Sequence, residues 1–211
     1  MTDHIPQGSP EWFALRVGKV TASRMADLMA KTKTGFGASR ANYMAELVAE
    51  RLTGQPAERF TNSAMNWWTE TEPQARAAYA FFRDMNVTET GFFNHPKIAM
   101  SGASPDGLVG DDGLLELKCP NTATHIESLL SGAVAEKYIP QMLWQMACTG
   151  RKWCDFASFD PRLPPKLQLF VKRIPRDEKR IAELEDAVRA FLSELDGKLS
   201  ALNALETEKA A

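Results

Sequence analysis

Two carboxylates and a lysine stand close together in the stretch SPDGLVGDDGLLELKCP, residues 104–120. Asp106 begins a glycine turn, Glu116 follows ten residues later, and Lys118 comes two residues after Glu116. Side chains alternate between the two faces of a strand, so Lys118 is expected beside Glu116 and the flanking leucines on the opposite, core-facing side. A hairpin that joins Asp106 to this strand would bring both carboxylates to one point.

These residue types suit the hydrolysis of a phosphodiester with a divalent metal. Mg²⁺ prefers oxygen ligands and keeps several waters, so two carboxylates and one backbone carbonyl, here that of Leu117, are enough protein ligands. A lysine beside such a site can orient the attacking water and stabilise the negative charge that develops on the phosphate. A Pro-Asp-Gly turn and a solvated Glu-x-Lys pair are each common without any catalytic role. Only their order and spacing together favour a catalytic site.

The surrounding sequence predicts an α+β, or mixed α/β, domain with a central sheet. Apolar residues at helical spacing predict helices at 21–30, 40–53, 61–84 and 138–149, and a last one from about 177. Turn residues between short apolar stretches predict a β-meander with strands at 87–93, 97–103 and 113–119, followed by strands at 153–159 and 167–174. We expect Thr21 or Ser23 to cap the first helix, Gly54 to end the second and Pro73 to break the third.

Composition and cysteine content restrict the class of protein. The chain has 211 residues, 44% of them hydrophobic and 25% charged, which is ordinary for one globular domain over residues 1–211. No apolar run approaches the roughly 20 residues that span a membrane, and the first residues do not resemble a signal peptide. The three cysteines are far apart, so a disulfide framework and a zinc or iron–sulfur cluster are not expected. A reducing cytoplasm fits best.

The net charge of −2 conceals two regions of opposite sign. Residues 16–51 carry seven lysines and arginines against three acids, whereas residues 177–211 carry nine acids against five bases. A nearly neutral chain can therefore still offer a basic surface to nucleic acid.

Several motifs carry a resemblance to a known family. Pro105-Asp106 followed by Glu116-Leu117-Lys118 resembles the signature of the PD-(D/E)XK nuclease superfamily. WFALRVGKVTAS, SPDG, LELKCP and YIPQMLWQ followed by WCDFASFDPR are similar to the phage lambda exonuclease group of viral recombination (alkaline) exonucleases, from about residue 11 to about 180. The resemblance implies a restriction-endonuclease-like core, a central mixed β-sheet flanked by helices. It places a DNA-end-binding part at about 11–60, a catalytic core at about 61–175 and a C-terminal helix at about 177–200.

The resemblance also implies a role for each metal-site residue. Asp106, Glu116, the Leu117 carbonyl and Glu72 would hold the metal, two Mg²⁺ ions with Mn²⁺ as a substitute, and Lys118 would position the attacking water. The small residue that usually follows the tryptophan of this segment is here a second tryptophan, Trp68, which leaves the helix register open.

Two glutamines fall one turn apart on a predicted helix. Gln141 matches a glutamine that the family places at the active site and is expected to act with the catalytic residues. Gln145 has a plain alternative, a buried and satisfied core position.

Arginine and hydroxyl residues near the N-terminus suggest a phosphate site. Without the resemblance, a surface arginine beside a plain capped helix would be the favoured interpretation of Arg16 and Ser23. The family binds the 5′-phosphate of a DNA end with the corresponding residues, which implies Arg16, Ser23 and Ser104. Lys33, in the basic loop 31–40, would contact the DNA backbone, although a solvated loop lysine is nearly as good an interpretation.

The activity implied by the resemblance is a Mg²⁺-dependent, processive 5′-to-3′ exonuclease of linear double-stranded DNA. It would release 5′-mononucleotides and leave a 3′ overhang for phage-type recombination. A ring-shaped homotrimer and a single-strand annealing protein would be its partners, in the bacterial cytoplasm, with a phage or prophage as its source. Two alternatives stay open: a sequence-specific endonuclease on the same fold and a non-catalytic DNA-end-binding module.

Overall fold

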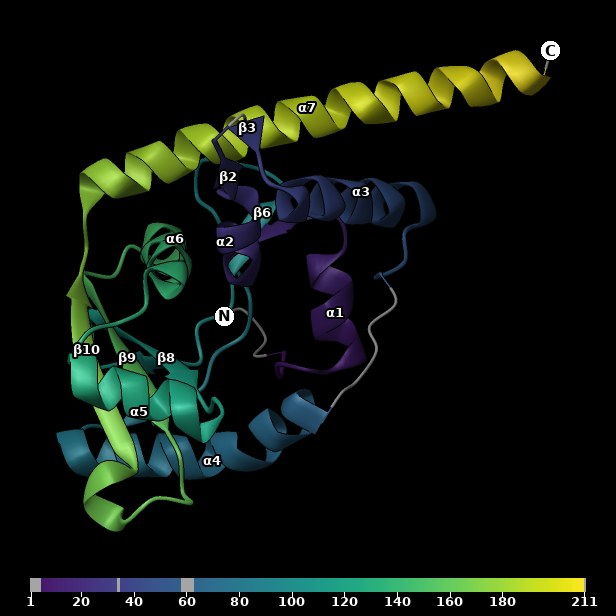
Figure 1. Cartoon of the computed structure of the whole chain (residues 1–211). Helices are drawn as coiled ribbons and strands as arrows, with labels where there is room; N and C mark the ends of the chain where they lie inside the picture. Colours follow the sequence, from purple (N-terminus) through teal and green to yellow (C-terminus); the bar gives the residue numbers. More distant parts are fainter. Residues whose placement is uncertain (1–4, 34, 58–62, 211) are drawn as a thin grey trace.

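Two β-sheets meet where the chain carries Asp106. The computed structural model describes residues 5–33, 35–57 and 63–210, with the side chains of 63–66, 68, 69 and 208–210 left undescribed. The larger sheet has five strands in the order β10-β9-β8-β7-β4 (Figure 1). They are β4 (Val87–Thr88), β7 (Gly107–Val109), β8 (Gly113–Lys118), β9 (Trp153–Phe159) and β10 (Leu169–Pro175). The smaller sheet holds β1 (Val20–Thr21), β6 (Ser101–Ala103) and β5 (Phe93–Asn94) in that order.

The larger sheet is mixed, as predicted. β8 runs parallel to β9, and the other neighbouring pairs are antiparallel. The predicted strands at 113–119, 153–159 and 167–174 are confirmed within two residues at each end.

The predicted β-meander is wrong. After β4 the chain leaves the larger sheet, forms β5 and β6 of the smaller sheet, and then returns as β7 and β8. The segments at 87–93 and 97–103 therefore contain strands of only two or three residues, and these pair in different sheets. Frequent turn residues allow such short pairings and carry little information about which strand is the partner.

Seven helices surround the sheets in the part of the chain that the structure describes. They are α1 (Pro10–Arg16), α2 (Met25–Leu28), α3 (Ala38–Thr53), α4 (Ser63–Arg83), α5 (Thr122–Ser131), α6 (Ile139–Thr149) and α7 (Glu178–Ala210). Shorter elements are the 3₁₀ turns η1 (Ala22–Arg24), η2 (Glu136–Tyr138) and η3 (Pro165–Leu167), and the hairpin of β2 (Lys31–Thr32) and β3 (Gly35–Phe36). None of the described helices is long and apolar enough to cross a bilayer.

The predicted helices α3, α6 and α7 are confirmed. α3 ends at Gly54, whose φ of 68° is the left-handed conformation that glycine adopts without strain. The predicted helix at 21–30 is wrong in its first half, which forms β1 and η1, and neither Thr21 nor Ser23 caps a helix through its side chain. Pro73 does not break α4, which continues through it. Residues 61 and 62, where the prediction began, lie outside the described residues.

Two helices were missed because each is short and defined mainly by its cap. α1 begins after Ser9, whose side chain accepts a hydrogen bond from the Trp12 backbone N–H at 3.1 Å. α5 begins after Asn121, which accepts from the Thr124 N–H at 2.9 Å. Both caps satisfy N–H groups that a helix start leaves without a partner.

The core has two layers, one on each face of β8. Leu114 faces the apolar cluster built by α3, α6 and α7, whereas Leu115 and Leu117 face α4, where Ala75 and Tyr79 are buried. The alternation predicted for β8 is thereby confirmed, and Glu116 faces the α6 side.

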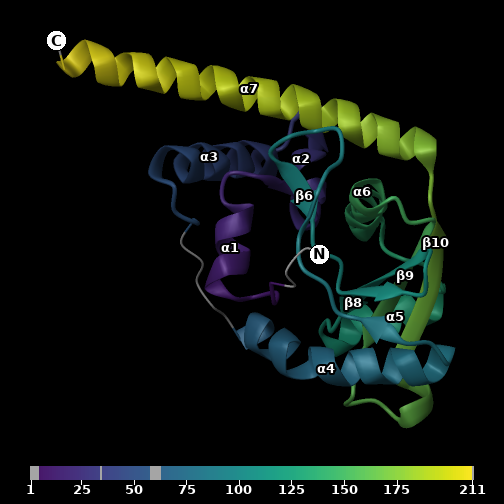
Figure 2. The ribbon, with the colours of Figure 1, turned by 180° about the vertical axis from the view of Figure 1, so that it is seen from behind.

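Ion pairs join α3 to α7, which lies along it and extends past the body of the molecule in both ribbon views (Figures 1 and 2). Arg40 lies 2.9 Å from Glu194, and Arg51 lies 2.7 Å from Asp196. The basic N-terminal region and the acidic C-terminal region thus partly neutralise each other. Arg40 and Arg51 therefore each already pair with an acid of α7.

We expect Gly102→Ala, in β6, to lower the free energy of unfolding by about 2 kcal/mol, the usual cost of overpacking a core. A methyl group there would lie 2.4 Å from the Phe93 carbonyl oxygen and 2.3 Å from the Phe92 ring. Urea unfolding measures the change. Gly197→Ala in α7 is the matched control, because its methyl group meets nothing within 4 Å. It should stabilise the helix by about 0.5–1 kcal/mol. Equal midpoints for the two variants would contradict the close packing of β6.

Candidate active site

Asp106 is hydrogen-bonded to β8 at the point where the chain passes from the smaller sheet to the larger one. Its backbone N–H donates to the Leu115 carbonyl at 3.1 Å, and its Oδ2 accepts from the Leu117 N–H at 2.7 Å. β7 then pairs with β8 as the predicted hairpin. The prediction that this hairpin brings Asp106 to the strand of Glu116 is confirmed.

Glu116 is fully buried in the middle strand of the sheet and binds three donors. Lys118 Nζ and Gln141 Nε2 both donate to Oε1, the latter at 2.6 Å, and Gln145 Nε2 donates to Oε2 at 2.6 Å. Lys118 therefore lies on the same face as Glu116, as strand alternation predicted. The two glutamines come from successive turns of α6, which packs over this face of β8.

Burial and neighbouring charge set the protonation of the site. Burial raises the pKa of Asp106 well above its usual value, and the negative charge of Glu116 raises it further. Burial alone would lower the pKa of Lys118, but the carboxylates of Glu116 and Asp106 outweigh it and raise that pKa above its usual value. Lys118 is therefore a firmly held cation between two acids.

Glu72, on α4, approaches the same site from the opposite side of β8. Burial raises its pKa, while its ion pair with Arg76 on the next turn acts in the opposite direction. Its charge also contributes to the raised pKa of Asp106, so the two carboxylates are electrostatic neighbours. Glu70, by contrast, is exposed. The structure places Glu72 near Asp106 but binds it to Arg76.

The donor set fits a hard divalent cation with few protein ligands. Among the described residues, no three His, Cys, Asp or Glu side chains form a cluster that could hold a metal ion by itself. Asp106 and Glu116 nevertheless form a buried pair whose mutual repulsion a cation would relieve. Mg²⁺ is commonly held by one or two carboxylates and completes its shell with water and substrate oxygens.

The three residues predicted to bind a 5′-phosphate are joined through one tryptophan. Trp12 Nε1 donates to Ser104 Oγ at 2.9 Å, and the Arg16 guanidinium lies 4.0 Å above the Trp12 ring. Arg16 in turn donates to Ser23 Oγ at 3.5 Å. Ser104 lies two residues before Asp106, so this group adjoins the carboxylates.

Trp12 was not among the predicted site residues. Its spacing could have revealed it, because a tryptophan and an arginine four residues apart share one face of a helix. Lys33 lies elsewhere. It is exposed in the turn of the β2–β3 hairpin, which lies beside α7 and well away from β8 in Figure 1.

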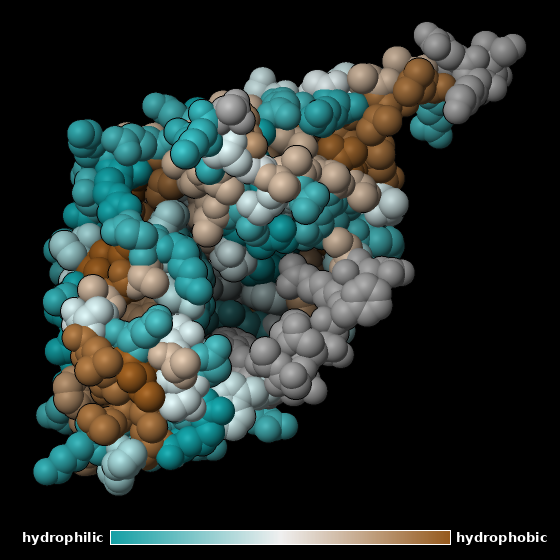
Figure 3. All heavy atoms as spheres, viewed as in Figure 1, coloured by the Kyte–Doolittle hydropathy of each residue, from teal (hydrophilic) through white to brown (hydrophobic). Residues whose placement is uncertain are grey.

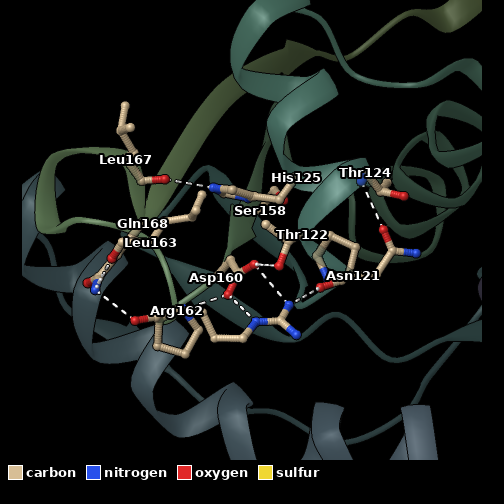
Figure 4. Close-up of polar contacts among 12 residues, drawn as sticks. Asn121, Thr122, Thr124, His125, Ser158, Asp160, Arg162, Leu163, Leu167 and Gln168 are labelled. Carbon is tan, nitrogen blue, oxygen red and sulfur yellow. Dashed lines mark hydrogen bonds and ion pairs between the residues drawn. The ribbon is translucent and has the colours of Figure 1, made fainter.

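A second polar network joins the end of β9 to the start of α5 and to α4 (Figure 4). Asp160, directly after β9, accepts hydrogen bonds from Arg162 Nε at 2.7 Å and from Thr122 Oγ1 at 2.7 Å. The Arg162 guanidinium lies 4.5 Å above the Trp67 ring of α4. The network therefore holds α4, and with it Glu72, against the sheet.

His125 supports the same corner of the molecule. Its two ring nitrogens lie 2.7 Å from Ser158 Oγ and 2.8 Å from the Leu167 carbonyl oxygen (Figure 4). Ser158 and His125 are both buried, so this pair packs α5 onto β9 and η3. The described contacts of His125 are those of a core residue.

Hydrophobic side chains also gather on the surface of this corner. Figure 3 shows them over α5, the helix in which Leu130 is 84% exposed and Ile126 is 39% exposed. This patch lies on the outer side of α5, apart from the carboxylates.

Comparison with known proteins identifies related sequences. Residues 11–152, which include every candidate site residue, match the model of a family described as the YqaJ-like viral recombinase domain. No curated protein matches the chain.

Solved structures of exonucleases share the fold. The alkaline exonuclease LHK-Exo from Laribacter hongkongensis is 55% identical, and the alignment covers 96% of this chain and all of that one, with a TM-score of 0.88. Its complex with dAMP gives a TM-score of 0.89 at the same identity and coverage. A phage-related exonuclease from Haemophilus somnus 129PT is 16% identical over 87% of this chain and 96% of that one, with a TM-score of 0.69. The predicted fold class, a PD-(D/E)XK core with a mixed sheet flanked by helices, is confirmed.

We expect Asp160→Asn to lower the free energy of unfolding near pH 7 by about 2 kcal/mol, since a buried charged acceptor is lost. Burial alone would raise the pKa of Asp160, but hydrogen bonds from Arg162 and Thr122 lower it to about 2. A depressed pKa means that the charged form stabilises the fold above about pH 4 and that this contribution disappears toward pH 2. The difference between variant and wild type should therefore shrink in urea titrations as the pH falls.

Asp112→Asn is the control for this experiment, because Asp112 is about half exposed and pairs only with Lys152 across the surface. Its effect should stay small at every pH. A difference for Asp160→Asn that is constant from pH 7 to pH 3 would contradict the assigned role of the network.

Proposed function

The chain belongs to the YqaJ-like viral recombinase domain family, and from that premise we propose that it is a Mg²⁺-dependent exonuclease of linear double-stranded DNA. It digests the 5′-ended strand processively, releases 5′-mononucleotides and leaves a 3′ overhang for recombination by strand annealing. One observation carries the proposal: a bend between two sheets and the strand β8 bring Asp106, Glu116 and Lys118 together. The similarity to an alkaline exonuclease at 55% identity supports it.

Asp106 and Glu116 would hold the metal in this proposal, with the Leu117 carbonyl and Glu72 completing its surroundings. The bound Mg²⁺ supplies Lewis-acid stabilisation of the charge that develops on the phosphate and on the leaving 3′-oxygen. Mn²⁺ is the expected substitute.

The protein side chains orient the nucleophile. Lys118 donates to Glu116 Oε1, so its ammonium group can hold a water in line with the phosphorus and stabilise the charge on the phosphate. Gln141, which donates to the same oxygen, keeps that carboxylate in place from the helix above. The raised pKa of Lys118 favours an orienting donor over a general base.

The residues around Trp12 support the proposed 5′-to-3′ direction of digestion. Arg16, Ser23 and Ser104 offer a guanidinium and two hydroxyls beside the carboxylates, which suits the dianionic phosphate at a 5′ end. A phosphate held there would fix the first phosphodiester against Asp106 and Glu116. Lys33 and its neighbour Lys31, both exposed, are candidates for contacts to the DNA backbone farther from the end.

The proposed assembly rests on the family resemblance. We propose one nuclease unit over residues 1–211, a ring-shaped homotrimer that encloses DNA, and a single-strand annealing protein that coats the 3′ strand. The setting would be the bacterial cytoplasm, with a phage or prophage as the source of the protein.

We expect purified protein with Mg²⁺ to release mononucleotides from linear duplex DNA and to leave closed circles intact. Lys118→Ala should lower the rate by about 100-fold or more, within the range for loss of a group that acts on the nucleophile. Lys166→Ala, on an exposed part of η3, is the matched control and should keep the wild-type rate. Cutting of circles would favour the sequence-specific endonuclease. Binding of DNA ends without any cleavage would favour the non-catalytic end-binding module.

We expect Arg16→Ala to reduce the preference for 5′-phosphorylated over 5′-hydroxyl ends by about 10-fold, since a charge-assisted hydrogen bond is worth about 1.5–3 kcal/mol. The measurement is kcat/KM on the two labelled substrates. Arg180→Ala, at the exposed start of α7, is the control and should keep the wild-type preference. An unchanged preference in Arg16→Ala would contradict the phosphate site while leaving the nuclease activity standing.

A further inference from the structure

Gln145 contacts the catalytic carboxylate from inside the core. Its side chain has no exposed surface, and its Nε2 donates to Glu116 Oε2 at 2.6 Å. Its own Oε1 lies 3.9 Å from the Cys154 thiol, a weak donor on β9. Any buried glutamine needs hydrogen-bond partners for its polar groups. The NH₂ group of this one donates to Glu116, the residue on which the proposed chemistry depends.

We infer that Gln145 is a positioning residue that fixes the orientation of Glu116 and thereby its readiness to bind a divalent cation. The inference rests on the proposed function, and it assigns to Gln145 a role beyond that of a satisfied core residue.

The two oxygens of Glu116 have different surroundings. Oε1 is bound by Lys118, whose side chain is 24% exposed, and by Gln141, which is partly exposed. Oε2 is bound by the wholly buried Gln145. Oε1 can therefore exchange its partners when a cation or a substrate arrives, whereas Oε2 is held throughout.

An amide suits the inner position because it donates a hydrogen bond without adding charge. A carboxylate buried without a donor on this side would bear the full cost of desolvation. The thiol of Cys154 lies on the side of the amide oxygen, and the NH₂ group faces Glu116.

The rigidity of α6 makes this contact a fixed one. Gln141 and Gln145 lie one turn apart on a single helix face, and the residues between and after them are buried in the core. The helix ends at Gly150 in the left-handed conformation, and Thr149 Oγ1 donates to the Gln145 carbonyl at 2.8 Å. Gln145 is thus held at both its backbone and its side chain.

Gln145→Met tests the inference, because methionine has a similar volume and cannot donate. We expect the Mg²⁺ concentration for half-maximal cleavage to rise at least 10-fold, with a smaller fall in kcat at saturating Mg²⁺. Calorimetric titration of Mg²⁺ into the protein without DNA should show the same weakening. Binding of 5′-phosphorylated DNA ends in EDTA should stay within 2-fold of wild type.

Met146→Leu is the matched control, since Met146 is equally buried on α6 and makes no described contact with Glu116. It should leave both the Mg²⁺ titration and the cleavage rate at wild-type values. Unchanged Mg²⁺ binding in Gln145→Met, with an active wild type, would overturn the positioning role and leave the proposed function intact. A wild type that neither binds Mg²⁺ nor cleaves DNA would overturn the proposed function, and the positioning role with it.

A measurement on the wild type covers the case in which Gln145→Met does not fold. Side-chain amide protons are observed by ¹⁵N NMR in the metal-free protein and again after Mg²⁺ is added. Those of Gln145 should exchange slowly with solvent and keep their shifts, whereas those of Gln141 should shift. Exchange of the Gln145 protons as fast as that of the Gln141 protons would overturn the inference.

Discussion

A carboxylate without access to water, in the middle strand of a sheet, has to be satisfied by the protein around it. Glu116 meets this constraint with three donors that come from β8 itself and from two turns of α6. The position of α6 over the sheet is therefore needed to stabilise the buried charge of Glu116 as well as to complete the hydrophobic core. The apolar side of the same strand packs on α4, which carries Glu72 toward the site from the other face.

The position of Asp106 is set in a different way, by the passage of the chain from the smaller sheet to the larger one. The short strands β5 and β6 of the smaller sheet carry the chain away from the larger sheet, and Ser104-Pro105-Asp106 brings it back. This detour places Ser104 against Trp12 of α1 and Asp106 against β8 within three residues. One short segment thus links the proposed phosphate site to the proposed metal site.

The parts of the fold that could be predicted are those set by local patterns. The alternation in GLLELK and the helical spacing around Gln141 predicted β8 and α6, and these two elements bring together the carboxylates, Lys118 and Gln141. The division of the short strands between two sheets could not be predicted, because pairs of two residues carry too little pattern. The contact between Gln145 and Glu116 could not be predicted either, because the sequence pattern of a buried glutamine does not depend on which group it binds. The chemical roles of these residues stay predictions.

The ion pairs between α3 and α7 also affect how the protein forms. Arg40 and Glu194 are 154 positions apart, and Tyr43 stacks on Phe191 at 5.5 Å. Contacts of such sequence separation close large loops and slow folding. During synthesis, α3 emerges early but lacks its ionic and aromatic partners until α7 has been made. The helix α3 therefore gains these long-range contacts only when the chain is nearly complete.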